Sequence, residues 1–326
     1  MGRKGVAWII IGVLITTLIG LIVIKSDSFI SANSLGGSEH RKWNEESLKG
    51  HGTDKIVQLT MEGVIAEQTG GLMGGGGLNA ADFISQLEQT RLDEDVKAVV
   101  IRVNSPGGEV VASDEIHSKI LELKQAGKPV IVSMGSVAAS GGYYISAPAD
   151  YIFANPATMT GSLGVIFSVG NYEKAADWLG YTENTIKSGA YKDIGSPLRE
   201  MTPEEQQILQ TLVDESYQQF VTIIEKGRNL PREKVLQIAD GRIYTGQQAK
   251  ALGLVDEFGT LETATNHAAK KAGVQEYELV RYSKEPSFSD LFSGAMVKSA
   301  NPGAEMLKEI LPDASIGPKL MYLYQS

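Results

Sequence analysis

The alternation of apolar strands with amphipathic helices between residues 79 and 150 constrains the fold of this chain more than any other feature. Residues 96–103 and 130–134 are apolar runs of strand length, and each follows a segment whose apolar residues recur at helical spacing. Asn79 is placed to cap the first helix, and Gly127 to end the second. Strand and helix in this rhythm indicate βαβ units, so we expect an α/β fold in which helices cover a parallel sheet.

A stretch of small residues follows the second of these strands, with the sequence S-M-G-S-V-A-A-S-G-G-Y-Y at 133–144. We expect a helix to begin near Ala139, which places Ser140 at its N-terminus and Gly141 directly after it. Free amides at a helix start stabilise developing negative charge, and glycines let a substrate backbone approach. Serine is a weak nucleophile at its own pKa, so this interpretation needs a neighbouring base. The alternative is that these residues only pack a helix tightly against the sheet.

Composition excludes several kinds of chemistry. The chain has 326 residues, a formal net charge of −9 and no cysteine, which removes thiolate catalysis, disulfides and cysteine-bound metals. The negative charge, and the lack of a basic stripe with interleaved aromatic residues, argue against a nucleic-acid partner. Six glycines within residues 69–77 lack the G-K-[ST] sequence of a phosphate-binding loop, so we expect a plain loop there. We expect neither a cofactor nor a metal.

Residues 5–24 carry no charge and are long enough to span a bilayer as a helix. Arg3 and Lys4 precede them, and a short positive leader favours an N-terminus inside the cell with the remaining chain outside. A cleaved signal peptide is the alternative, with residues 31–33 as a weak cleavage site. We expect a retained single-pass anchor in the cell membrane, with the catalytic domain on the extracytoplasmic side.

The sequence divides into four parts by composition. The residues before 55 are polar and glycine-containing after the anchor, which is typical of a stalk, and the periodic pattern weakens beyond residue 283. Within the globular part, Thr202 and Glu205 form a capping box that opens a long helix through about residue 226. The predicted parts are a leader with transmembrane helix at 1–25, a polar stalk at 26–54, a globular domain at 55–282 and a C-terminal tail at 283–326.

The base that Ser140 needs is not obvious from residue type alone. Histidine is the usual partner of a nucleophilic serine, but none lies between His117 and His267, where the layers around Ser140 should come from. Lysine is the alternative, because burial lowers its pKa toward neutrality. Lys187 and Lys192 flank an unusual loop and are nearly equal candidates on these grounds, although most lysines simply lie at the surface.

Five motifs occur in order along the chain: N-S-P-G-G (104–108), S-V-A-A-S-G-G-Y-Y (136–144), T-G-S-L-G-V (160–165), K-S-G-A-Y-K-D-I-G-S-P (187–197) and A-D-G-R-I-Y-T-G (239–246). Together they resemble the signal peptide peptidases of the SppA type, which are serine peptidases of the Clp/crotonase superfamily. The resemblance covers residues 55–280. Each motif occurs once, so the chain resembles the short bacterial form rather than the duplicated long form.

The resemblance implies a Ser-Lys dyad with Ser140 as nucleophile and Lys192 as general base. It implies that Ser162 hydrogen-bonds the lysine amine and orients it, and that Gly107 and Gly141 form the oxyanion hole. It also implies the Clp/crotonase fold, with repeated ββα units, and a homo-oligomeric ring with active sites facing an internal cavity.

The function implied by the resemblance is that of a membrane-anchored serine endopeptidase that degrades signal-peptide remnants after their release from preproteins. We expect these and other extended peptides to pair with strand edges beside the site. Two alternatives from other classes are a crotonase-like acyl-CoA enzyme and a catalytically silent membrane scaffold of the same fold. A further hypothesis, from the apolar residues at 320–324, is that the C-terminal end enters the enzyme's own groove.

Overall fold

The computed structural model describes residues 43–67, 79–284 and 320–324. The predicted span at 5–24, most of the predicted stalk and most of the predicted tail lie outside these residues. Within the described ranges, no helix is long and apolar enough to cross a membrane.

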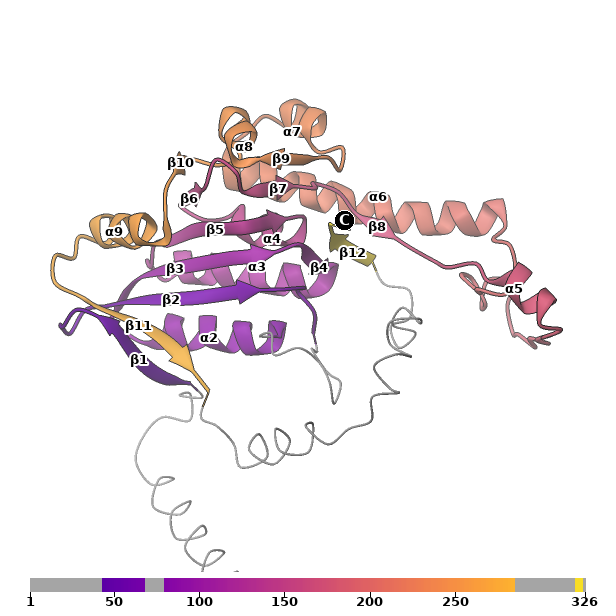
Figure 1. Cartoon of the computed structure of the whole chain (residues 1–326), viewed down its shortest axis with the longest axis horizontal. Coiled ribbons are helices and arrows are strands. Elements are labelled where there is room, and N and C mark those ends of the chain that lie inside the picture. Colours follow the sequence, from indigo (N-terminus) through magenta and orange to yellow (C-terminus); the bar gives the residue numbers. More distant parts are fainter. Residues whose placement is uncertain (1–42, 68–78, 285–319, 325–326) are drawn as a thin grey trace, which may run out of the picture. The chain divides into compact units, whose positions relative to one another are not determined.

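The predicted α/β fold with a parallel sheet covered by helices is confirmed (Figure 1). Seven strands lie side by side, and all neighbouring pairs are parallel except the pair at the β1 edge. In spatial order they are β1 (Asn44–Lys49), β11 (Glu278–Ser283), β2 (Lys55–Glu62), β3 (Val96–Ser105), β5 (Val130–Ala139), β6 (Tyr151–Ala154) and β10 (Glu257–Phe258).

The central strands are apolar on both faces because helices cover both sides of the sheet. Helices α2 (Ala80–Leu92) and α3 (Val110–Gln125) supply residues to the core cluster that contains Val99 and Ile101 of β3. The residue between these two, Val100, belongs to the opposite cluster, with α9 (Leu261–Ala272). Burial on alternate sides explains why the sequence shows continuous apolar runs here.

Both predicted helix boundaries in this region are confirmed. The Asn79 side chain accepts a hydrogen bond from the Asp82 N–H at 2.6 Å, and Gly127 follows the end of α3 with φ of 78°. Residues 44–49 of the predicted stalk, by contrast, form β1 on the sheet edge, and Trp43 beside them is buried. The side chains of β1 are almost all exposed, so its sequence resembles a polar linker.

The remaining elements extend the sheet at the carboxyl end of β5. Strand β7 pairs in parallel with the end of β5, and β9 pairs antiparallel with β7. The predicted long helix is α6, which begins at the capping box of Thr202 and Glu205 and packs into the core through Phe220 and Ile224. The bounds are α4 (Gly141–Ser146), β7 (Met159–Gly161), α6 (Pro203–Arg228), α7 (Arg232–Ile238), β9 (Ile243–Thr245) and α8 (Gly246–Leu252).

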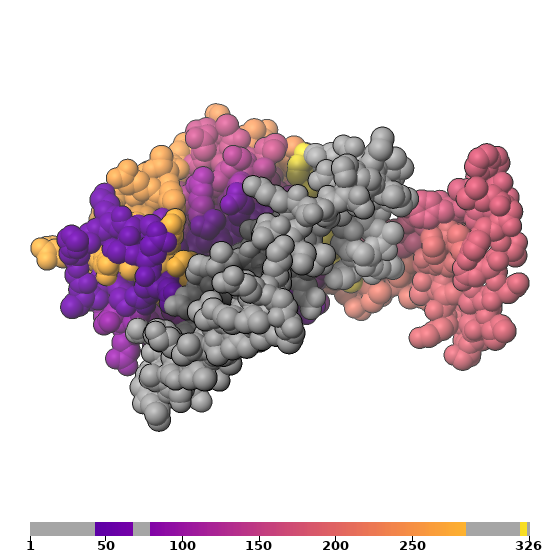
Figure 2. Space-filling model, turned by 60° about the horizontal axis from the view of Figure 1, so that its bottom comes forward, coloured from indigo at the N-terminus to yellow at the C-terminus, as the bar shows by residue number. Residues whose placement is uncertain are grey.

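Residues 168–202, which we call the arm, project away from the body of the domain together with the N-terminal half of α6 (Figures 1 and 2). The arm contains one short helix, α5 (Glu173–Trp178), and none of its residues is buried. Trp178 is 85% exposed and Ile186 fully exposed. Exposure of large apolar side chains to water is unfavourable. Apolar surface of this kind is typical of sites where another molecule binds.

A second, three-stranded sheet lies beside the carboxyl ends of β3 and β5. Its strands are β4 (Gly107–Glu109), β12 (Leu320–Leu323) and β8 (Ile166–Phe167), with β12 in the middle and antiparallel to both neighbours. Strand β12 therefore lies between the segment that carries the first motif and the segment that directly follows the third.

Candidate active site

Ser140 lies where β5 ends and α4 begins. Its φ of 53° is a left-handed conformation that costs a non-glycine residue about 1–3 kcal/mol. The residue is 1% exposed, and its Oγ has no hydrogen-bond partner among the described residues. Strained backbone and unpartnered buried polar atoms both concentrate at functional sites. The sequence-predicted nucleophile therefore has the local structure of a reactive residue.

The turn at Gly107 and Gly108 lies against the first turn of α4. A Cβ built on Gly107 would be 3.0 Å from the Ser140 Cβ and 2.7 Å from the Gly141 nitrogen. One built on Gly141 would be 3.0 Å from the Gly108 nitrogen. Gly107 also has φ of 104°, which strongly favours glycine. The structure thus brings three predicted site residues, Ser140, Gly107 and Gly141, into one place.

Ser162 follows β7, on the backbone next to that of Ser140. Ala139 lies opposite Gly161 in the β5–β7 pairing, and the Ser140 N–H donates to the Gly161 carbonyl at 2.8 Å. Ser162 is nearly buried, with φ of 49°, and its N–H donates to the Arg242 carbonyl at 2.8 Å. The two predicted serines therefore lie on adjoining segments that backbone hydrogen bonds hold in place.

Strand β12 lies over this site as an extended peptide. Leu323 pairs with Gly107 and Tyr322 with Gly108, and the Tyr324 N–H donates to the Pro106 carbonyl at 2.8 Å. The Tyr322 carbonyl oxygen is 2.0 Å from where a Cβ on Gly107 would be, so it lies directly against the glycine turn. The hypothesis that the C-terminal end enters the groove agrees with this placement.

Comparison with known proteins identifies the family. The model of Peptidase family S49 matches residues 122–275. A relative from Enterococcus faecium, named "Putative signal peptide peptidase SppA", is 38% identical over 291 residues, which is 85% of this chain and 84% of the relative. The chain belongs to peptidase family S49. It is therefore a serine peptidase, as predicted from its motifs, and this favours neither the acyl-CoA enzyme nor the silent scaffold.

Other comparisons differ in how much of the relative they cover. Protease 4 of Salmonella typhi is 38% identical over 76% of this S49 peptidase, but the match spans only 38% of that longer protein. Serine protease SPPA of Arabidopsis thaliana is 34% identical over 74% of this chain and 37% of its own length. Among solved structures, a ClpP1 mutant from Listeria monocytogenes aligns over 62% of this chain and 91% of its own, at 20% identity and a TM-score of 0.41.

Lys192 of this S49 peptidase lies on the arm and not beside Ser140. It is exposed, and its Nζ makes no hydrogen bond or ion pair with any described residue. The other candidate, Lys187, donates from Nζ to Asp193 Oδ1 at 2.6 Å and to the Ala190 carbonyl at 3.0 Å. One lysine is therefore bound within the loop while the other is free. Within the described residues, Lys192 does not hydrogen-bond Ser140 Oγ.

None of the described histidines hydrogen-bonds Ser140. The His117 ring packs edge-on against Tyr144 at 5.5 Å, and burial lowers the pKa of the imidazole. His267 stacks on Tyr151 at 4.2 Å, at the α9 side of the sheet. Ser140 Oγ has no hydrogen-bond partner in this part of the chain, so neither imidazole is bonded to it there.

The side chain of Tyr322 fills an aromatic pocket that the sequence did not predict. Its ring stacks on Tyr144 at 4.7 Å and contacts Phe220 at 4.8 Å, while its hydroxyl donates to the Ser216 carbonyl at 3.1 Å. Burial raises the pKa of the Tyr322 phenol above its ordinary range. The pocket joins α4 to α6, which are far apart in the sequence, and only the Y-Y pair of the second motif hinted at it.

A second hollow continues the groove past Leu323. This cavity has a volume of about 410 Å³ and lies next to Ser162. Its wall includes apolar side chains from two segments and two carboxylates, namely Val165, Val213, Tyr217, Asp214 and Asp240. No described cluster of His, Asp and Glu side chains, here or elsewhere, has the arrangement to hold a metal ion. The described site consists of a hydroxyl, backbone amides and pockets for side chains.

Proposed function

We propose that this S49 peptidase is a membrane-anchored endopeptidase that degrades signal-peptide remnants, with Ser140 as nucleophile and Lys192 as base. The observation that carries the proposal is the state of Ser140. Its buried, unpartnered hydroxyl lies at a strained turn, against a glycine turn and beneath an extended strand. This arrangement suits attack on a peptide carbonyl by a hydroxyl whose base comes from elsewhere.

The chemistry is acyl transfer to the serine, followed by hydrolysis. Ser140 Oγ attacks the carbonyl carbon while the neutral Lys192 amine takes the hydroxyl proton. The C–N bond then breaks as the ammonium returns this proton to the leaving amine. Water, deprotonated by the same lysine, releases the acyl group as a carboxylic acid and restores the serine. Ser162, on the backbone beside Ser140, orients the lysine amine.

The oxyanion of this reaction needs two donors near Ser140. The Gly141 amide, at the start of α4, is one. The Gly107 N–H already donates to Ser105 Oγ at 3.1 Å, whereas the Gly108 nitrogen lies close to Gly141. We therefore assign the second donor to Gly108, with Gly107 providing the turn that brings it there. Each donor of this kind contributes about 3 kcal/mol to lowering the barrier.

The position of Lys192 leads us to propose that the dyad forms between two protomers of a ring. The arm carries Lys192 away from its own Ser140 and exposes Trp178, Leu179 and Ile186 to water. A neighbouring copy that covers these side chains would gain their burial and would shield the lysine from water, which favours the neutral amine. Such a contact uses two different surfaces, and repeated head to tail it closes into a ring.

The groove is suited to an extended apolar peptide. β12 takes the place of such a peptide, paired on both edges, with one aromatic side chain in a pocket and the groove continuing past Leu323. Signal peptides are apolar, and β-strand addition binds any backbone with free edges. The uncharged residues 5–24 would anchor the ring at the extracytoplasmic face of the cell membrane, within reach of this substrate.

Mixing two inactive variants tests the shared dyad. Ser140→Ala and Lys192→Ala should each be inactive, because each lacks half of every dyad. In a mixed ring, an intact site forms where the serine comes from a Lys192→Ala protomer and the lysine from a neighbouring Ser140→Ala protomer. In an equal random mixture each condition holds for half of the sites, so about a quarter of the sites are intact. We expect peptidase activity to return to about a quarter of the wild-type value, measured in detergent with a fluorogenic peptide after dissociation and reassembly.

The same mixture distinguishes the alternatives. If each protomer used its own lysine, the mixed rings would stay as inactive as either parent, provided that mass measurement shows mixed assemblies. Wild-type turnover by Lys192→Ala alone would remove the lysine from the mechanism altogether.

A further inference from the structure

We propose that Arg199, Asp193 and Glu205 are positioning residues, which fix the loop at 187–199 on the N-terminus of α6 so that Lys192 is presented in one geometry. The inference rests on the proposed role of Lys192 as base. It goes beyond that role because it says what holds the lysine in place.

The loop has no apolar support. None of residues 187–199 is buried, so hydrophobic packing does not determine its shape. Its internal backbone contacts are short-range turns, such as the Lys192 N–H to the Gly189 carbonyl at 3.2 Å and the Ser196 N–H to the Asp193 carbonyl at 3.0 Å. Turns of this kind fix the local path but not where the loop lies relative to the domain.

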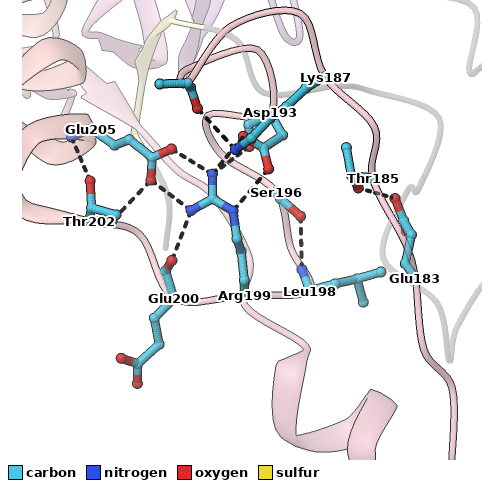
Figure 3. A network of polar contacts seen from close by, with 11 residues as sticks. Glu183, Thr185, Lys187, Asp193, Ser196, Leu198, Arg199, Glu200, Thr202 and Glu205 are labelled. Carbon is cyan, nitrogen blue, oxygen red and sulfur yellow. Dashed lines mark hydrogen bonds and ion pairs between the residues drawn. The ribbon is translucent and has the colours of Figure 1, made fainter.

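Hydrogen bonds from Tyr172 and Asn171 hold the end of the loop to the rest of the arm. Arg199 connects the loop to α6, because its guanidinium bridges two carboxylates (Figure 3). Its Nε and Nη2 donate to the two Asp193 oxygens at 3.1 and 3.0 Å. Its Nη1 and Nη2 donate to the two Glu205 oxygens at 2.8 and 2.5 Å. A planar fork with two bonds to each partner sets orientation as well as distance. Asp193 is the residue next to Lys192, so this contact constrains the lysine's own backbone.

Glu205 connects the network to the rest of the protein. Its side chain is 3% exposed and also accepts from the Thr202 N–H at 3.0 Å, while Thr202 Oγ1 accepts from the Glu205 N–H at 3.2 Å. This capping box opens α6, whose other end is buried in the core through Phe220. A continuous series of contacts therefore runs from the core, along α6 and through Arg199, to the backbone of Lys192.

The carboxylates of the network stay ionised across the pH range in which a peptidase is assayed. Hydrogen bonds from the Arg199 guanidinium hold the pKa of Asp193 well below its usual range and lower that of Glu205 to about 2. Lys187 closes the loop from the other side through its bond to Asp193. The two lysines of the motif therefore have different roles. Lys187 stabilises the loop through its hydrogen bonds, whereas Lys192 Nζ bonds to no described residue and is available as the base.

The test uses substitutions that keep shape but remove this geometry, in full-length protein in detergent. Asp193→Asn removes the negative charge that the Arg199 guanidinium binds. Arg199→Lys replaces the planar guanidinium by an ammonium, which is a point charge and does not bridge two carboxylates. We expect kcat to fall about 10- to 100-fold in each, because misplacing a reacting group by about 1 Å costs up to about 10²-fold. KM and the ring size should stay close to wild type, and the variants should remain folded at the assay temperature although the thermal midpoint falls, because the same ion pairs also stabilise the fold.

Two matched variants make the result specific. Glu183→Gln is a carboxylate-to-amide change on the same arm, where Glu183 contacts only Thr185 among the residues of Figure 3, so its kcat should be that of wild type. The double variant Asp193→Asn/Arg199→Lys should lose no more than the more affected single variant, because both changes break one connection.

Lys192→Ala, measured in the same series, separates this inference from the proposed function. If Lys192→Ala is inactive but Asp193→Asn and Arg199→Lys turn over like wild type, the positioning role is overturned and the lysine base stands. If their kcat falls only in proportion to a loss of folded protein or of assembled ring at the assay temperature, the network is merely structural and the inference also fails. Wild-type kcat in Lys192→Ala would overturn the proposed function itself, and the positioning role with it.

Discussion

Gly107→Ala is the substitution whose effect the structure specifies most closely. The added Cβ would lie 2.7 Å from the Gly141 nitrogen and 2.0 Å from the Tyr322 carbonyl oxygen, both shorter than real Cβ contacts. The glycine turn or the start of α4 must therefore move by at least a few tenths of an ångström. The oxyanion donors that we assign to Gly108 and Gly141 lie at this contact.

Two costs follow from this geometry, and they affect different measurements. The φ of 104° penalises any side chain, at roughly 1–2 kcal/mol, and this appears as lower stability. Displacing one oxyanion donor costs about 3 kcal/mol in the barrier, which is a loss of about 10²-fold in kcat. The clash of the new Cβ with the Tyr322 carbonyl oxygen is a separate effect. It is removed by measuring the variant also in a shortened chain that ends at residue 319 and so lacks β12.

Gly127→Ala is the matched control for the strain. Gly127 has φ of 78° at the end of α3, and a Cβ there would meet no described atom within 4 Å. We expect both variants to lower the thermal midpoint, but only Gly107→Ala to lower kcat for a fluorogenic peptide. If Gly107→Ala keeps wild-type kcat in both the full-length and the shortened chain, the glycine turn is not part of the oxyanion hole.

Three further changes have defined outcomes. Ser162→Ala should lower kcat by about 10- to 100-fold with little change in KM, since the Lys192 amine becomes an ammonium as it takes the proton and a hydrogen bond to a charged group contributes about 1.5–3 kcal/mol. An unchanged kcat in steady-state assays would remove Ser162 from the site. Tyr322→Ala deletes a buried ring, a change that costs about 3–5 kcal/mol in cores, so β12 should dissociate and a fluorophosphonate probe should label Ser140 at least about tenfold faster. Equal labelling rates would mean that β12 does not limit access. The pKa of Glu205 is lowered from 4.5 to about 2 by its bonds to Arg199, so its carboxylate stabilises the fold fully above about pH 4.5 and loses this effect as the pH falls toward 2. The thermal midpoint of wild type should therefore exceed that of Glu205→Gln at pH 6, and the difference should shrink at pH 3; a constant difference would contradict this assignment.

The sequence predicted those parts of the fold that local interactions determine. Strands β3 and β5 are continuous apolar runs because both their faces are buried, and the Asn79 cap and the capping box of α6 are formed by residues three positions apart. Ser140 was recognisable as a candidate because a serine at a strand-to-helix turn, followed by two glycines, suits nucleophilic chemistry, although the same residues also suit tight packing of a helix on a sheet. In each case the residues that cause the structure are neighbours in the chain.

The parts that the sequence did not predict depend on partners far away. β12 pairs with β4 more than 200 residues earlier, and four apolar residues do not specify which edge they join. β1 is exposed on nearly every side chain, so it has no alternating pattern to detect. The sequence also did not predict that Lys192 lies away from Ser140. Each residue belongs to a family motif, and these motifs are the same whether the two residues meet within one chain or between two chains.

The length of α6 makes this enzyme sensitive to changes far from its chemistry. With 26 residues at 1.5 Å each, the helix is about 39 Å long, and about 26 Å of it lies between its N-terminus and the buried Phe220. A tilt of only about 2° at Phe220 moves the N-terminus of α6, and with it the loop that Arg199 holds, by about 1 Å. Substitutions that repack the core side chains around Phe220 should therefore change kcat even where they leave the thermal midpoint nearly unchanged. Variation at these core positions among natural sequences is a place to look for differences in catalytic speed.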